Sequence, residues 1–175
     1  VAGLPASRFV GSHFRIMVKD NAQILVAGPA VVSRAFGKDF TKEDLGGSNV
    51  HKKNGVTDNI AESEEDAFNQ IKKFLSFFPS NIYELPPKKD SKDETNRSEK
   101  ILEEIIPKDR KKTYEMREII KTVVDDKDFF EISNFFGRGI ITGFARLNGF
   151  SVGIFANDSN FYAGSMTADN AKKTT

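Results

Sequence analysis

A run of mixed charge divides this sequence into two apolar blocks, and it limits the fold more than any other feature. Between Lys88 and Lys112 the chain carries nine Lys or Arg residues and seven Asp or Glu residues. A stretch of this composition cannot bury enough apolar surface to form a core of its own, and connections of this kind run over the surface of a protein. We therefore expect two folded lobes, residues 1–80 and 113–175, joined by a charged connector over residues 81–112.

The first block carries patterns for two strands and for three helices, which begin at Pro29, after a capping Thr41 and after a capping Ser63. Residues 14–19 alternate apolar and polar side chains, as a half-buried strand does, and residues 22–27 are apolar enough for a strand buried on both faces. Gly28 and Pro29 predict the start of a helix, because proline is favoured in a first helical turn. Residues 64–78 predict the longest helix, whose phenylalanine, isoleucine and leucine side chains recur at helical spacing and are expected to pack in the core.

The second block predicts a helix followed by antiparallel strands. Apolar side chains recur at helical spacing over residues 116–124, and a short strand is predicted at residues 129–132. Residues 140–147 and 150–156 are two apolar segments joined by Asn148-Gly149. This dipeptide between such segments is the strongest short-range signal for a hairpin with a type I′ turn, so we expect the two segments to pair as antiparallel strands.

The overall composition excludes several classes of protein. There are 26 Lys and Arg residues against 25 Asp and Glu, a net charge of +1, whereas a nucleic-acid-binding protein needs a clear basic surplus. No apolar run approaches the ~18 residues of a membrane-spanning helix. The absence of cysteine excludes a disulfide framework, a thiolate zinc site, an iron–sulfur cluster and a cysteine nucleophile.

The glycines and histidines give no site when they are considered alone. Gly3, Gly28 and the pair Gly46-Gly47 match neither nucleotide-binding fingerprint, so turn glycines are the better interpretation. His13 and His51 have no acids at metal-ligand spacing, and the chain lacks the GxSxG motif of a serine nucleophile. We expect His13, which precedes a strand, to be structural. His51, in a predicted loop after two glycines, is the better site candidate of the two, but we favour a hydrogen-bonding role for it. The residue patterns alone therefore predict a two-lobed α/β protein whose site they do not name.

Longer strings of residues carry more information. The strings are Ala27-Gly28-Pro29-x-Val31-Val32, Glu43-Asp44-Leu45-Gly46-Gly47, Asn54-Gly55-Val56-x-Asp58, Tyr114-x-x-Arg117-x-Ile119-Ile120 and Gly143-Phe144-Ala145-Arg146-Leu147-x-Gly149-x-x-Val152-Gly153-Ile154-x-Ala156-Asn157. Together they resemble the carboxyltransferase (β) subunits of biotin-dependent acyl-CoA carboxylases, such as propionyl-CoA and methylcrotonyl-CoA carboxylase. The likeness covers nearly the whole chain except the charged connector.

The resemblance implies a fold, a setting and partners. It implies an α/β, crotonase-like carboxyltransferase fold of two related lobes, of which this sequence would be a fragment: the end of the N lobe, the connector and the start of the C lobe. It implies an acyl-CoA substrate, biotin carried by a biotin carboxylase or biotin carrier partner, and self-association into a dimer or a hexamer core. No metal, nucleotide, nucleic acid or membrane span is expected in this chain. The implied location is the mitochondrial matrix or the bacterial cytoplasm.

The resemblance also implies a reaction and its site. The reaction is carboxyl transfer from carboxybiotin to the α-carbon of an acyl-CoA through a thioester enolate, whose oxyanion is stabilised by backbone N–H groups at a helix N-terminus. The N-lobe oxyanion turn of the family maps onto Gly3-Leu4-Pro5-Ala6, with the backbone amides of Gly3 and Leu4 as the catalytic donors. The implied substrate-binding residues are Pro5, Ala6, Gly28 and Pro29.

Two departures from the family pattern and two alternative functions accompany this hypothesis. Pro5 replaces a small residue that is often glycine, and Asn157-Asp158-Ser159 replaces Asn-Gln-Pro, which predicts an altered loop. One alternative is a biotin-dependent acyl-CoA decarboxylase or transcarboxylase, which handles the same pair of substrates. The other is a non-catalytic scaffold paralogue, and Pro5 is its main support.

Overall fold

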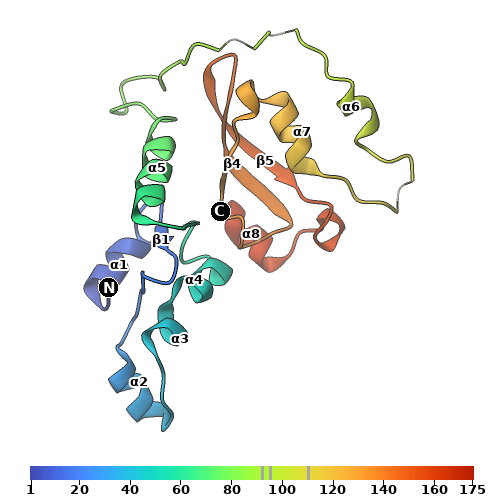
Figure 1. Cartoon of the computed structure of the whole chain (residues 1–175). Coiled ribbons are helices and arrows are strands. Elements are labelled where there is room, and N and C mark those ends of the chain that lie inside the picture. Colours follow the sequence, from blue (N-terminus) through green and yellow to red (C-terminus); the bar gives the residue numbers. More distant parts are fainter. Residues whose placement is uncertain (92, 95, 110) are drawn as a thin grey trace. The chain divides into compact units, whose positions relative to one another are not determined.

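The computed structural model describes residues 1–91, 93–94, 96–109 and 111–175 (Figure 1). By its internal contacts the chain divides into two compact units, Val1–Gln70 and Ile71–Thr175, which are described separately below. The assignment of residues 1–80 and 113–175 to the two carboxyltransferase lobes stays a prediction.

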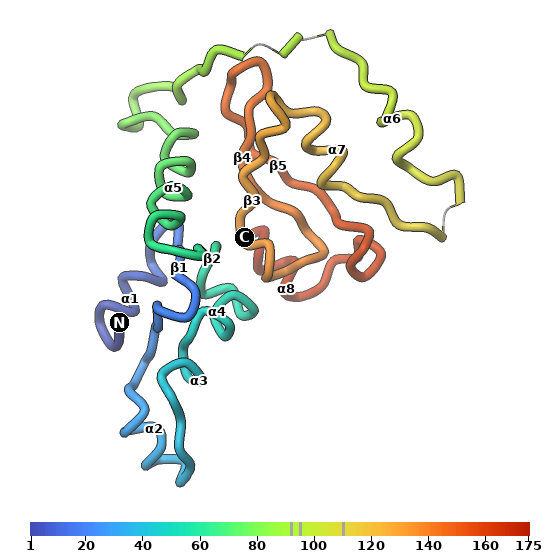
Figure 2. The backbone as a smooth tube through the Cα atoms, viewed as in Figure 1, coloured from blue at the N-terminus to red at the C-terminus, as the bar shows by residue number. Residues whose placement is uncertain are grey.

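The first unit consists of short helices around a small parallel sheet. Its elements are α1 (Leu4–Val10), β1 (Ile16–Val18), α2 (Pro29–Phe36), α3 (Lys42–Gly46), α4 (Ser48–Asn54), β2 (Asn59–Ala61) and most of α5 (Glu64–Leu75). Strands β1 and β2 pair in parallel, with Met17 opposite Ile60, and Figure 2 shows the two side by side. The core of this unit contains Ala6, Met17 and Ile24. Helix α1 is therefore packed against β1 and against the segment over residues 22–27, which follows β1 in the chain.

The segment over residues 22–27 differs from its prediction. It is not a strand buried on both faces: only isolated bridges form, between Leu25 and Ala2 and between Gln23 and Gly47. Ile24 and Leu25 are buried, but Val26 is 94% exposed. On the Gly47 side the partner is a single residue between α3 (Lys42–Gly46) and α4 (Ser48–Asn54), which is too little for a ladder.

Helix α5 begins as predicted and ends early. The Ser63 hydroxyl accepts a hydrogen bond from the backbone N–H of Asp66 at 3.1 Å, which caps the helix. The prediction that its whole apolar face packs in the core is wrong for Phe68 and Leu75, which are 62% and 59% exposed. Because the helix ends at Leu75, Phe77 lies beyond it and its side chain does not follow the helical periodicity. Phe77 is buried.

The second unit is a three-stranded antiparallel sheet with helices. Its elements are α6 (Ile101–Glu104), α7 (Met116–Val123), β3 (Phe130–Ile132), β4 (Ile140–Leu147), β5 (Phe150–Asn157) and α8 (Ala168–Thr174), in the sheet order β3-β4-β5. Helix α7 packs on the sheet through Ile120, which clusters with Val124, Ile141 and Ala145 in the core (Figure 1). On the same sheet the ring of Phe77 stacks with that of Phe144 at 5.6 Å between centroids.

The predicted hairpin is confirmed. Leu147 pairs with Phe150, and the two residues between them have φ angles of 50° for Asn148 and 80° for Gly149, as a type I′ turn requires. Asp125, which is only 7% exposed, fixes this turn: its carboxylate accepts hydrogen bonds from the backbone N–H groups of Asn148 at 2.9 Å and Gly149 at 2.7 Å.

We expect Asp125→Ala to lower the free energy of unfolding by about 2–3 kcal/mol, because two turn amides lose a charged acceptor. Burial by itself would raise the pKa of Asp125, but hydrogen bonds from Gly149, Asn148 and Ser91, together with the charge of Arg97, outweigh burial and lower this pKa. A pKa lowered by folding gives stability that is present at neutral pH and lost as the pH falls through the folded-state pKa. Urea unfolding from pH 7 to pH 3 should show the loss in the parent and a flatter profile in the variant. Equal slopes would contradict this prediction.

Candidate functional site

The start of helix α1 carries the amides that the sequence singled out. Gly3 has φ 63°, a left-handed conformation that favours glycine, and Leu4 is the first helical residue. The backbone N–H of Gly3 donates to the carbonyl of Leu25 at 3.2 Å, and the N–H of Ala6 donates to the carbonyl of Gly3 at 3.0 Å. Pro5 has no N–H. Among the described residues, the amide of Leu4 has no acceptor, so this N–H can donate to a group from outside the chain.

A cavity of about 680 Å³ lies beside this turn. Its lining is almost entirely apolar and consists of Gly3, Leu4, Ala6, Ser7, Val10, Ile24, Leu25, Val26, Leu45, His51 and Val56. An apolar cavity with a few polar groups is the usual form of a small-molecule site. The N-terminal end of a helix also carries partial positive charge, which favours a developing anion there.

The structure separates the residues that the sequence grouped as substrate contacts. Ala6 lines the cavity and also packs in the core, with 8% exposure. Pro5 is exposed and does not line the cavity. Gly28 caps α2 in an extended conformation and Pro29 is the first residue of that helix, as predicted, and neither lines the cavity.

His51 was expected to form hydrogen bonds, and this is confirmed. Its Nε2 atom lies 2.8 Å from the carbonyl oxygen of Ile24, and its Nδ1 atom lies 3.4 Å from Nδ2 of Asn54. The sequence did not predict that His51 would also line the cavity. The sequence pattern predicted a loop after two glycines and made His51 the better site candidate of the two histidines, whereas the structure places His51 in helix α4.

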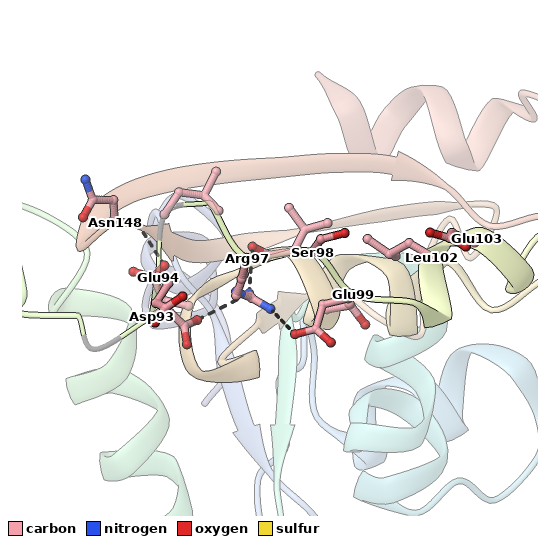
Figure 3. A pocket seen from close by; sticks show the side chains of 12 residues that line it. Asp93, Glu94, Arg97, Ser98, Glu99, Leu102, Glu103 and Asn148 are labelled. Atoms are coloured by element: carbon pink, nitrogen blue, oxygen red, sulfur yellow. Dashed lines mark hydrogen bonds and ion pairs between the residues drawn. The ribbon is translucent and has the colours of Figure 1, made fainter.

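A second cavity, of about 540 Å³, lies within the second unit between the charged connector, α7 and β4. Figure 3 shows Arg97 there, between Asp93 and Glu99. The Arg97 guanidinium also donates to the carbonyls of Val123 at 3.3 Å and Val124 at 3.0 Å. A cation at these carbonyls stabilises the C-terminal end of α7, so this arrangement anchors the connector to the second unit.

The described parts of the chain contain neither a metal-binding cluster nor a membrane-spanning helix. Within residues 1–91, 93–94, 96–109 and 111–175, no three His, Cys, Asp or Glu side chains are grouped so that they could hold a metal ion. Over the same ranges, no helix has both the length and the apolar character that crossing a bilayer requires.

Comparison with known proteins places these features in context. A family model described as "Carboxyl transferase domain" matches residues 7–175. The methylmalonyl-CoA decarboxylase subunit alpha of Veillonella parvula is 37% identical over 164 residues, 93% of this chain and 32% of that protein. The mitochondrial propionyl-CoA carboxylase beta chain of Homo sapiens is 34% identical over 163 residues, 93% of this chain and 30% of that protein. The chain thus spans about a third of the length of these relatives.

Solved structures agree with the sequence relatives. A crystal structure of transcarboxylase 12S with hydrolysed methylmalonyl-coenzyme A bound covers 98% of this chain and 34% of its own, with a TM-score of 0.92 and 32% identity. A single-chain, multi-domain long-chain acyl-CoA carboxylase covers 98% of this chain and 17% of its own, with a TM-score of 0.80 and 24% identity, and so bears on the fold alone. The expected α/β, crotonase-like fold class is confirmed by this likeness.

Proposed function

Because this chain belongs to the carboxyl transferase domain family, we propose that it is part of a subunit that transfers a carboxyl group to the α-carbon of an acyl-CoA. The observation that carries the proposal within this chain is the amide of Leu4, which has no internal acceptor among the described residues and lies at the apolar cavity. The sequence relatives that are carboxylases of propionyl-CoA support the same substrate class.

The geometry supports a specific role for the helix start. Removal of a proton from the α-carbon of a thioester places negative charge on the thioester oxygen. The N–H of Leu4, at the positive end of α1, is positioned to donate to that oxygen, and it needs no titratable side chain to do so. Gly3, proposed as a second donor from the sequence, already donates to Leu25, so its part in the proposal is to orient Leu4.

The apolar cavity has the complementary role of holding the acyl part of the substrate away from water. Leu4, Val10 and Val56 supply apolar surface for it, and Ala6 closes it toward the core. Pro5, Gly28 and Pro29 remain proposed substrate contacts that lie outside this cavity. Biotin, when bound, supplies the carboxyl group, and no set of described residues in this chain identifies its site, so we place it on a partner subunit.

The proposed partners follow from the family. They are a biotin carboxylase or biotin carrier subunit and further copies of this subunit, as transcarboxylase 12S, a relative of known structure, assembles into a hexamer. The relatives include mitochondrial and bacterial chains, which supports a mitochondrial matrix or bacterial cytoplasmic location.

One alternative function is favoured by a specific observation. The relative with 37% identity is a methylmalonyl-CoA decarboxylase subunit, and the structure with a TM-score of 0.92 is a transcarboxylase. A decarboxylase or transcarboxylase would use the same oxyanion donor on the same class of substrate. The scaffold alternative depends on Pro5, but Pro5 removes only its own amide and leaves that of Leu4 in place.

The proposed function is tested with the complete subunit assembled with its biotin-carrying partner. ATP-dependent fixation of labelled bicarbonate is measured on acetyl-, propionyl-, methylcrotonyl- and a long-chain acyl-CoA. Carboxylation of one of them is the expected result. Loss of CO2 from methylmalonyl-CoA without ATP would favour the decarboxylase instead. No transfer in either direction, by an assembly that is intact, would favour the scaffold.

A further inference from the structure

His51 joins helix α4 to the backbone segment that runs along the cavity. Because a carbonyl oxygen only accepts hydrogen bonds, the Nε2 atom that lies 2.8 Å from the carbonyl of Ile24 carries the proton. The Nδ1 atom is then the accepting nitrogen, which suits the amide of Asn54 at 3.4 Å. Both ring nitrogens are therefore engaged, and His51 is not available as a general base although it lines the cavity.

The carbonyl that His51 holds is adjacent in the chain to the carbonyl that holds the oxyanion turn. Leu25 accepts the hydrogen bond from the N–H of Gly3 at 3.2 Å. Ile24 donates its own N–H to the carbonyl of Gly46 at 2.8 Å. The dipeptide Ile24-Leu25 is thus held by Gly46 and His51, and in turn it holds Gly3, the residue before the proposed donor.

This segment has little freedom to adjust if one of its bonds is lost. A Cβ atom on Gly46 would lie 1.9 Å from the carbonyl oxygen of Ile24 and 2.7 Å from Cδ2 of Leu25, so backbone and side chain already meet closely there. Ile24 is 7% exposed, so bulk water is excluded from most of this residue. Without the His51 donor, a largely buried carbonyl has to find another partner, and Leu25 and Gly3 shift with it.

From these contacts we propose that His51 is a positioning residue for the reaction. Through the carbonyl of Ile24 it fixes Leu25 and Gly3, and so it sets the direction in which the N–H of Leu4 points into the cavity. This inference rests on the proposed function of Leu4 as the oxyanion donor. Misplacement of a catalytic group by about 1 Å can cost about 100-fold in rate, so an indirect contact of this kind is expected to affect turnover.

The test compares three variants. His51→Leu removes the donor and puts an apolar side chain in its place. His51→Gln keeps an N–H that can reach the same carbonyl. His13→Leu is the control, because it changes the other histidine of the sequence, which is exposed. Amide hydrogen exchange at Gly3 and Ile24 is measured by NMR in this chain. Values of kcat and KM for the acyl-CoA are measured in the complete subunit assembled with its biotin-carrying partner.

We expect His51→Leu to speed exchange at Gly3 and to lower kcat by about 10- to 100-fold, with KM changed by less than about twofold. His51→Gln should restore most of kcat and slow the exchange again, and His13→Leu should match the parent in both. Unchanged exchange at Gly3 in His51→Leu would overturn the inference, and so would faster exchange with an unchanged kcat. If the parent assembly carries out no acyl-CoA reaction, the proposed function fails, while the exchange result still decides whether His51 holds the turn.

Discussion

Replacement of Leu4 by proline is expected to lower kcat for carboxylation by about 100-fold or more, because loss of one oxyanion donor costs about 2.7–4 kcal/mol of transition-state stabilisation. The substitution removes the one amide at the start of α1 that has no acceptor among the described residues. The fold should tolerate it, since proline is favoured at the first helical position and the Leu4 side chain is 69% exposed. Steady-state kinetics of the complete, assembled subunit give the measurement.

The matched control is Leu4→Ala, which shortens the same side chain and keeps the N–H. It should retain kcat within a few-fold and raise KM if the leucine side chain contacts the acyl group. If Leu4→Pro folds, assembles and turns over at the parental rate, the turn at Gly3 is not the oxyanion hole, and the scaffold alternative gains support.

The parts of the fold that the sequence predicted well are those specified by local interactions. The hairpin of β4 and β5 depends on two residues whose left-handed backbone is needed for the turn, so Asn148-Gly149 was sufficient to predict it. The start of α2 at Pro29 and the cap of α5 at Ser63 are likewise decided within a few residues. Each of these signals acts through the backbone of its own segment.

The wrong predictions depend on distant parts of the chain. Residues 22–27 have the composition of a buried strand, but they form isolated bridges, and one partner, Gly47, is a single residue between two helices. Phe68 has the spacing of a core residue, and Phe77 is buried instead because α5 ends at Leu75. No local pattern contains that information.

In the candidate site too, the sequence indicated what a local motif contains but not the contacts between residues that are distant in the chain. The resemblance indicated Gly3 and Leu4 together, since both belong to one motif. Only the structure separates them, because the N–H of Gly3 is engaged by Leu25, a residue 22 positions away in the chain, and that of Leu4 is not. The link from His51 to Ile24 spans 27 positions and has no local signature either.

The largest loss of stability is expected for Arg117→Met, in a network that includes Asp158, a residue that departs from the family pattern. The Arg117 guanidinium makes two hydrogen bonds to Glu131, at 2.8 and 2.6 Å, and a further one to Asp158, whose side chain is 1% exposed. The hydrogen bond to Glu131 is the largest cause of the raised pKa of Arg117, so the network stabilises the protonated form of the guanidinium. Removal of the cation takes away the ion pair of the buried Asp158 carboxylate and leaves it the N–H of Asn160 at 3.0 Å. Loss of one partner of a buried ion pair typically costs about 3–5 kcal/mol.

Lys121→Met is the matched control for this variant, because Lys121 lies on the same helix and its ion pair with Glu118 is about half exposed. Its removal should change the free energy of unfolding by less than about 0.5 kcal/mol, as is usual for a surface pair. Both variants are measured by urea unfolding of this chain at pH 7. Adding Asp158→Asn to Arg117→Met removes the uncompensated charge and should recover part of the loss. A loss below about 1 kcal/mol in Arg117→Met would show instead that water screens the network, and Asp158 would then have no larger role than the exposed Glu118 of α7.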